Sequence, residues 1–220
     1  MPFMDGVDAA SFPARAITST DGQVVVVRPL TRADAASFGE FLEGLSPQTR
    51  KRYNPHPLTR AQAAEVCSRL DEDTRSLRIV LAREHVDEQI AGDVPPDTPR
   101  IVGYMLVQFA IPQDEKDRYA DQGIILDDDK DCRIAPAVAD HLQSRGLGTA
   151  LLKDSLAFLR SSGRRVVVLF GGTQASNAQA IRAYEKAGFE AAGAFRTGLI
   201  DNVDMWLSLD AWTADSGTQR

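Results

Sequence analysis

Residues 135–149 read A-P-A-V-A-D-H-L-Q-S-R-G-L-G-T and hold the pattern that decides the fold. The first five residues are a short apolar run typical of a strand, and a helical spacing of leucines follows from Leu147 to Leu159. Two glycines, Gly146 and Gly148, lie where the strand pattern gives way to the helical one. The order is therefore strand, glycine loop and helix.

This glycine loop is suited to binding a pyrophosphate. Gly146 and Gly148 let the backbone come close to a ligand and adopt dihedral angles that a Cβ would obstruct. The first N–H groups of the following helix have no partners within the helix, and the helix dipole adds partial positive charge there. Arg145 adds a fixed cation that matches phosphate oxygens. A dinucleotide fingerprint would need a third glycine where Leu151 stands, and the Gly-Lys-Ser/Thr of a Walker loop is absent.

Two motifs together resemble the GCN5-related N-acetyltransferases, the GNAT family. The acetyl-CoA loop of that family reads Gln or Arg, two residues, Gly, one residue, then Gly or Ala, and Gln143, Gly146 and Gly148 match it. Further along the chain, residues 177–189 read N-A-Q-A-I-R-A-Y-E-K-A-G-F and resemble the family's next helix. The resemblance extends over roughly residues 24–209.

The resemblance implies an α/β fold with a mixed, twisted, splayed central sheet flanked by helices, the acyl-CoA N-acyltransferase fold. It also implies direct transfer of acetyl from acetyl-CoA to a primary amine. Main-chain groups of Ala137, Val138 and Ala139 would pair with the pantetheine arm, and the Val138 N–H would donate to the thioester oxygen. Pro136 marks either the splay of this strand or a shift of one residue in the register. The other implied acetyl-CoA contacts are Gln143, Ser144, Arg145, Gly146, Leu147, Gly148, Thr149 and Asn177.

Tyr184 is the candidate general acid for the departing thiolate. A CoA thiol has a pKa near that of cysteine, about 8.5, and a tyrosine phenol has a pKa of about 10. A phenol held beside the sulfur can therefore donate a proton at modest cost. The alternative is that Tyr184 packs its ring in the core, because Ala180 and Ala187 share its helical face.

The general base is less well marked. Some members of the family place a glutamate early in the cofactor strand, but Cys132 stands at that position. Asp131 and Asp140 are candidate bases, of which we select Asp131, or they are strand-end residues in solvent. An amine that binds in its neutral form would need only a water relay. Cys132 as a nucleophile would require a positioned base and a lowered pKa, so we interpret it as a small buried residue.

The composition is typical of one globular domain. The chain has 220 residues, 43% of them hydrophobic, and a formal net charge of -6, which argues against general affinity for nucleic acid. We expect a domain over 16–212 between flexible tails at 1–15 and 213–220. Two cysteines do not make a disulfide framework, and no metal-ligand spacing is present, so no metal is expected. No signal peptide or membrane-spanning run is found, and we expect a cytoplasmic monomer or homodimer.

Two further segments have alternative interpretations. Residues 46–57 read S-P-Q-T-R-K-R-Y-N-P-H-P and form either a solvated connector or a wall of the substrate pocket. Residues 111–131 carry eight Asp or Glu against three Lys or Arg, and either steer a cationic amine or form a solvated edge. The D-D-D-K-D core of this acidic insert lacks the glycine and the closing glutamate of a calcium loop.

The remaining elements follow from caps and periodicity. Thr31 with Asp34, and Thr59 with Gln62, predict two helix starts. Strands are expected at 23–29, 77–83, 100–110, 165–170, 189–196 and 202–209, and helices at 147–162 and 177–187.

Three functional classes therefore stay open. The first is an N-acetyltransferase that acts on a protein lysine or N-terminus, a polyamine, an aminoglycoside or an amino sugar. The second is an acyl-CoA-binding sensor without catalysis, motivated by the missing carboxylate on the cofactor strand. The third is a nucleotide-binding protein that uses the same loop for ATP or NAD.

Overall fold

The computed structural model describes residues 11–53, 55–83 and 99–213. These residues form two compact units. The N unit contains the described residues up to 106 together with 136–151, and the C unit contains 107–135 and 152–213. Two strands and one helix run from one unit into the other, so each unit is described by itself.

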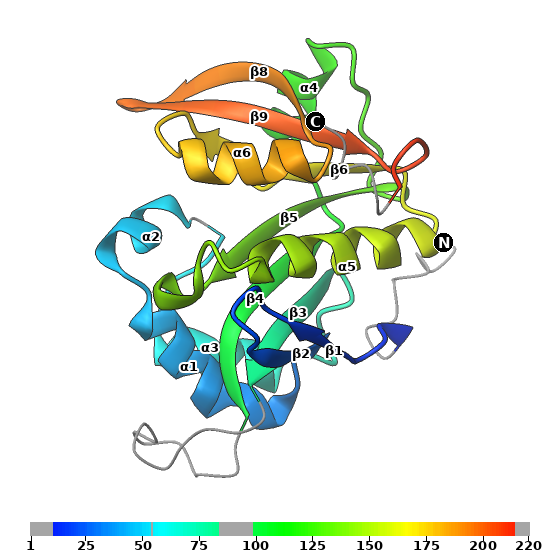
Figure 1. Ribbon diagram of the computed structural model, residues 1–220. Helices are drawn as coiled ribbons and strands as arrows, with labels where there is room; N and C mark the ends of the chain where they lie inside the picture. Colours follow the sequence, from blue (N-terminus) through cyan, green and yellow to red (C-terminus); the bar gives the residue numbers. More distant parts are fainter. Residues whose placement is uncertain (1–10, 54, 84–98, 214–220) are drawn as a thin grey trace. The chain divides into compact units, whose positions relative to one another are not determined.

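The N unit is built from antiparallel strands and three helices (Figure 1). The strands are ordered β1-β2-β3-β4, and α1 packs against α3. The bounds of these elements are β1 Arg15–Thr18, β2 Val24–Pro29, η2 Arg32–Asp34, α1 Ala35–Gly44, α2 Pro47–Arg52, α3 Arg60–Ser68, β3 Ser76–Arg83 and β4 Arg100–Gln108.

Both predicted helix starts in the N unit are confirmed. Asp34 Oδ2 accepts a hydrogen bond from the Thr31 N–H at 2.8 Å, and Asp34 also forms a two-pronged ion pair with Arg28. The Thr59 hydroxyl accepts from the Gln62 N–H at 3.1 Å. Each interaction satisfies a backbone donor that the first helical turn leaves without a partner.

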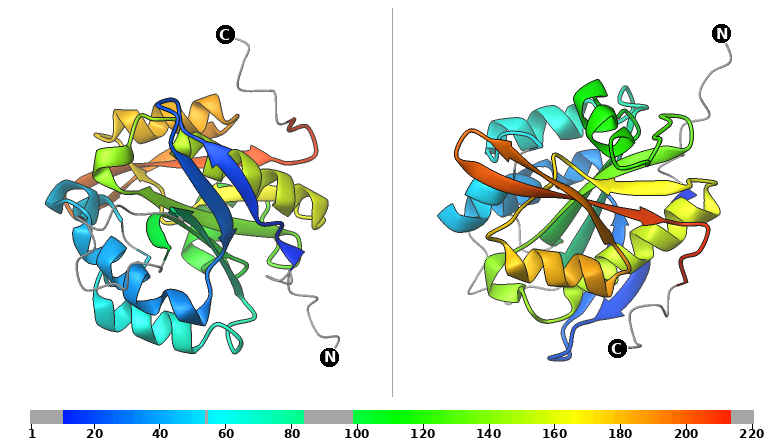
Figure 2. Two further views of the ribbon diagram at one scale, coloured as in Figure 1. Left: turned by 60° about the horizontal axis from the view of Figure 1, so that its bottom comes forward. Right: turned by 90° about the horizontal axis from the view of Figure 1, so that it is seen from above.

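The C unit contains a mixed arrangement of strands. β5 and β6 are parallel, while β6, β7 and β8 each pair antiparallel with β9, so the order is β5-β6-β9-β7 with β8 also on β9. In Figure 2 (right), α4 and α6 lie on opposite sides of β8 and β9. The bounds of the remaining elements of the chain are α4 Gln113–Ala120, β5 Asp131–Val138, η4 Asp140–Leu142, which lies in the N unit, α5 Leu147–Ser161, β6 Val166–Leu169, β7 Thr173–Gln174, α6 Ala178–Lys186, β8 Glu190–Thr197 and β9 Ile200–Ser208.

The predicted α/β fold with a mixed sheet and flanking helices is confirmed. In total nine strands join one hydrogen-bonded order, and most of the pairs are antiparallel. Among the described residues, five elements were not predicted: β1, α2, α4, η4 and β7. They are short or polar, so they lack a long hydrophobic period. Most of the predicted tails, 1–15 and 213–220, lie outside the described residues, as does most of the loop that follows β3.

The pairing of β5 explains the position of Pro136. The pairing of β5 with β6 runs up to Ile134 opposite Leu169, and one further bond joins the Phe170 N–H to the Ile134 carbonyl at 2.9 Å. Pro136 therefore lies beyond the residues of β5 that pair with β6, where a missing N–H costs no bond of that ladder.

Among the helices of the described part of the chain, none is long and apolar enough to cross a membrane.

Candidate active site

The loop after β5 has the backbone that the glycine pattern predicts. Ser144 and Gly146 adopt positive φ angles of 62° and 81°. The Gln143 side chain donates from Nε2 to the Val138 carbonyl at 3.1 Å, which ties the loop back to the end of the strand. The bond from the Ala150 N–H to the Gly146 carbonyl, at 2.9 Å, opens α5. The N–H groups of the first helical turn therefore lack partners within the helix.

The fold does not require the two glycines of the loop equally. Gly146 has a backbone conformation that disfavours any side chain, and a Cβ there would lie 3.3 Å from the Thr20 methyl group. A Cβ on Gly148 would lie 3.5 Å from a Val138 methyl group, which is an ordinary contact. The fold itself therefore needs glycine at 146 and tolerates alanine at 148, in agreement with the motif.

The sequence did not predict that the β1–β2 turn contacts this loop. The Thr20 N–H donates to the Arg145 carbonyl at 3.0 Å, and the Arg145 guanidinium pairs with Asp21. A hydrogen bond from Ser19, together with Arg145, lowers the pKa of Asp21, so this carboxylate is ionised at neutral pH. Arg145, which we expected to bind a phosphate, is therefore already paired with the Asp21 carboxylate of the same unit.

Asp140 lies between the strand and the loop, and it holds α2. Its carboxylate accepts from the Ser46 hydroxyl at 2.6 Å, from the Ser46 N–H at 2.8 Å and from the Thr49 hydroxyl at 2.7 Å. Desolvation favours protonation, but the hydrogen bonds from Ser46 and Thr49 outweigh it and lower the pKa of Asp140. Its geometry therefore indicates a positioning role.

Helix α6 carries the second motif and belongs to the C unit. Asn177 is its N-cap and accepts from the Ala180 N–H at 3.4 Å. None of the nine residues of α6 is fully buried, although Ile181 and Tyr184 lie on its apolar side. The Tyr184 ring lies 5.7 Å from the Phe189 ring, and burial raises the pKa of the Tyr184 phenol above its ordinary value. The phenol is therefore protonated at neutral pH.

The carboxylate at the start of β5 is engaged in hydrogen bonds within the fold. Asp131 is fully buried and accepts hydrogen bonds from Arg165 at 2.9 Å and from two backbone N–H groups, those of Asp127 and Val166. Both of its oxygens are engaged, which indicates a structural role. Burial raises the pKa of the adjacent Cys132 thiol to about 12, so this residue is a poor nucleophile.

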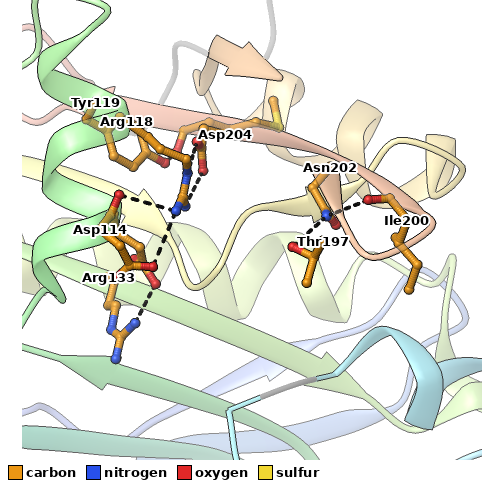
Figure 3. Close-up of polar contacts among 10 residues, drawn as sticks. Asp114, Arg118, Tyr119, Arg133, Thr197, Ile200, Asn202 and Asp204 are labelled. Carbon is orange, nitrogen blue, oxygen red and sulfur yellow. Dashed lines mark hydrogen bonds and ion pairs between the residues drawn. The ribbon is translucent and has the colours of Figure 1, made fainter. Parts of the chain in front are cut away.

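The acidic insert folds as α4 and pairs its carboxylates with cations of the C unit. Figure 3 shows Arg118 reaching both Asp114 and Asp204. Arg133 pairs with Glu115 of α4 at 2.6 Å. Burial raises the pKa of Glu115, and among the described residues its Oε2 atom has no hydrogen-bond partner. Four of the eight carboxylates of the insert, those of Asp114, Glu115, Asp128 and Asp131, form ion pairs, so part of its charge is engaged within the fold.

A cavity of about 310 Å³ lies in the N unit, where α3 turns into β3. Its charged side chains pair with one another, including Arg78 with Asp73 at 2.8 Å and Arg69 with Glu72 at 3.4 Å. It contains none of the residues that the sequence motifs select. We therefore centre the candidate site on the loop before α5.

Residues 97–189 match the model of the acetyltransferase (GNAT) family. This part of the chain is similar to that family. The match includes both sequence motifs, the loop before α5 and helix α6 up to Phe189. Among curated proteins, no sequence matches the chain.

Solved structures of the same fold cover most of the chain. The GNAT domain of Streptomyces (S.) lividans PAT is 18% identical, covers 89% of this chain and 96% of its own, and has a TM-score of 0.63. RimJ of Mycobacterium smegmatis, solved with CoA-disulfide, is 14% identical, with coverages of 91% and 90% and a TM-score of 0.65. The aminoglycoside acetyltransferase AAC(6')-Ib, solved with coenzyme A and kanamycin, is 22% identical, with coverages of 89% and 99% and a TM-score of 0.59. These similarities establish the GNAT fold.

Proposed function

We propose that this protein is a cytoplasmic N-acetyltransferase that transfers acetyl from acetyl-CoA directly to a primary amine. The observation that carries the proposal is the loop before α5, with its positive-φ residues Ser144 and Gly146 and an open helix start. Such a loop presents consecutive N–H groups to a pyrophosphate. Its place within the family match supports acetyl-CoA over other nucleotides.

Residues of the loop and of the strand end would hold the donor. Gln143 to Thr149 would bind the pyrophosphate, and Arg145 would exchange part of its pairing with Asp21 for phosphate oxygens. Ala137 would pair its main-chain groups with the pantetheine arm. The same role was expected of Ala139, but the Ala139 N–H already donates to the Val102 carbonyl at 2.9 Å and the Ala139 carbonyl accepts from the Leu142 N–H at 2.8 Å, so we do not assign it to this residue. The Val138 N–H would donate to the thioester oxygen and stabilise the negative charge that develops there during attack.

Tyr184 would complete the transfer, with Asn177 bordering CoA at the start of the same helix. The amine nitrogen attacks the thioester carbon, the carbon–sulfur bond of the intermediate breaks, and the Tyr184 phenol gives its proton to the leaving thiolate. The amine releases its own proton to water. We assign no proton transfer to Asp131, because both of its oxygens already accept hydrogen bonds within the fold.

Two of the structural neighbours support this proposal through their bound molecules. RimJ was solved with CoA-disulfide, and AAC(6')-Ib with coenzyme A and kanamycin. The low identities do not select an acceptor for the present chain, so the proposal is limited to a primary amine. The experiment is incubation with acetyl-CoA and a panel of amines, with acetylated products detected by mass spectrometry. Transfer to at least one amine is expected.

A second candidate is a sensor that binds acyl-CoA without turning it over. The engagement of Asp131 by Arg165 and by backbone N–H groups favours it, because β5 then offers no carboxylate as a base. Replacing Tyr184 by Phe separates the two candidates. The enzyme turns over as wild type, loses turnover in Tyr184→Phe and keeps CoA binding, whereas the sensor shows no turnover in either form and binds CoA equally in both.

A further inference from the structure

Helix α2 is fixed beside the strand end that would hold the thioester. Asp140 follows Val138 by two residues and accepts three hydrogen bonds from Ser46 and Thr49 in the first turn of α2. Both elements belong to the N unit, and Figure 1 draws α2 next to the chain that enters α5. The position of α2 is therefore set by the same strand and loop that we propose for acetyl-CoA.

The other end of α2 is also fixed. The Arg50 guanidinium donates to the Leu42 carbonyl at 2.8 Å and to the Leu58 carbonyl at 2.7 Å. These bonds join the segments before and after α2 through one side chain. A six-residue helix is about 9 Å long at a rise of 1.5 Å per residue, so the last turn of α2 lies within about that distance of the end held by Asp140.

This last turn has a cationic side chain available for a ligand. Arg50, Lys51 and Arg52 follow one another, and residues 46–53 contain no Asp or Glu. Arg52 is half-buried, and its side chain has no ion pair or hydrogen bond with the residues that the structure describes. Glu43, the preceding acid in the chain, is already paired with Arg60 at 2.9 Å. Among the described residues, the charge of Arg52 therefore has no partner.

The neighbouring rings do not supply that partner. Tyr53 is buried, and its ring meets the His56 ring edge-on at a centroid distance of 5.4 Å. Burial lowers the pKa of His56, so this histidine is neutral at pH 7 and adds no second charge. A partly buried arginine without a partner is suited to a carboxylate, which its planar fork binds in a two-pronged geometry.

We infer that Arg52 recognises a carboxylate on the acceptor, so that the preferred substrates are amines that carry an acidic group. This inference rests on the proposed function, because α2 is relevant only if the strand end at Val138 holds the thioester. It excludes simple diamines as the best acceptors. Under this inference, the basic segment at 46–57 is a wall of the substrate pocket, and the charge that binds the substrate lies in α2.

Matched acceptor pairs test the inference. Lysine and cadaverine have the same terminal amine and differ by the carboxylate, and β-alanine and ethylamine form a second such pair. Thiol release is measured for each acceptor with the wild-type protein, with Arg52→Gln and with the control Arg75→Gln, which removes an exposed arginine from the turn before β3. We expect kcat/KM for the carboxylate member of a pair to fall roughly tenfold or more in Arg52→Gln and to stay unchanged in Arg75→Gln. The values for cadaverine and the dissociation constant of CoA should stay unchanged in both variants.

The outcomes separate the inference from the proposed function. Turnover by the wild-type protein without preference for the carboxylate member, or equal loss for both members in Arg52→Gln, overturns the inference and leaves the acetyltransferase intact. Absence of turnover with every amine, despite CoA binding, contradicts the proposed function and the inference with it. An Arg52→Lys variant with intermediate kcat/KM for lysine would support recognition by both charge and the guanidinium fork.

Discussion

The loop at 143–148 and helix α6 carry the two family motifs, and they are built in different ways. The loop is determined by its backbone: positive φ angles at Ser144 and Gly146 and the hydrogen bond from Gln143 to Val138 leave little choice of conformation. Helix α6 is an ordinary capped helix whose apolar side has no fully buried residue. A binding function of the loop is therefore sensitive to backbone changes, whereas a function of α6 depends on single side chains.

The sharpest test of this comparison is Gly146→Asp. A side chain at φ 81° strains the loop, and a negative charge there repels a pyrophosphate, so we expect CoA affinity to fall roughly 100-fold or more. The matched control is Gly146→Asn, which has nearly the same shape, tolerates this backbone and lacks the charge. Calorimetric titration should rank the wild type first, Asn second and Asp last. Unchanged affinity in the Asp variant would place the pyrophosphate elsewhere.

Tyr184→Phe should reduce turnover and leave CoA binding unchanged, whereas Gly146→Asp should reduce CoA binding. Removal of the phenol takes away the proposed proton donor and keeps the ring that lies beside Phe189, so kcat should fall roughly 100-fold while CoA affinity stays within about twofold. Stopped-assay thiol release and calorimetry on the same preparation check the two quantities. Parallel loss of binding and turnover would instead assign Tyr184 to packing.

Asp21→Asn should affect the loop by a smaller amount. Asp21 pairs with Arg145 on an exposed surface, where solvent screens the two charges and such pairs contribute little to stability. Loss of the carboxylate frees Arg145 and removes a negative charge near the phosphate, so we expect CoA to bind about twofold to fivefold more tightly at low salt. Weaker binding would show that Asp21 instead holds Arg145 in its binding position.

The pH dependence of the reaction should show no effect of Tyr184 in the ordinary range. Burial raises the pKa of this phenol above its usual value of about 10, and the acid role needs the protonated form. Ionisation of Tyr184 would therefore reduce kcat only above pH 10. The check is a profile of kcat from pH 7 to 10 at saturating acetyl-CoA. A tyrosine-dependent fall below pH 9, absent in Tyr184→Phe, would argue against a raised pKa.

The two regions also show which features a sequence predicts. The loop conformation was predictable because Gly146 is a local requirement, and the starts of α1 and α3 because Thr31, Asp34 and Thr59 act over three residues. Contacts between distant segments could not be predicted, because local spacing in the sequence does not encode them. Examples are the contacts of Asp21 with Arg145 and of Ser46 with Asp140. The same limit explains why Asp131 looked available as a base: its partner Arg165 lies far along the chain, directly before β6.

Helix α2 and the acidic insert illustrate the limit in a second way. Both are short and polar, so neither has the hydrophobic period that predicts a helix. Their charges were visible in the sequence, but their partners were not. In the structure Glu115 pairs with Arg133, whereas Arg52 has no partner among the described residues. We therefore interpret the insert as a structural part of the fold and α2 as a candidate for binding the acceptor.

Titration of the wild-type protein with acetyl-CoA in a calorimeter, followed by thiol release from the same sample across amines, tests the central claim most directly. The account predicts micromolar binding and release that depends on the amine. Binding without release from any amine would contradict the transferase and favour the sensor. Absence of binding would contradict the role of the loop at 143–148 itself.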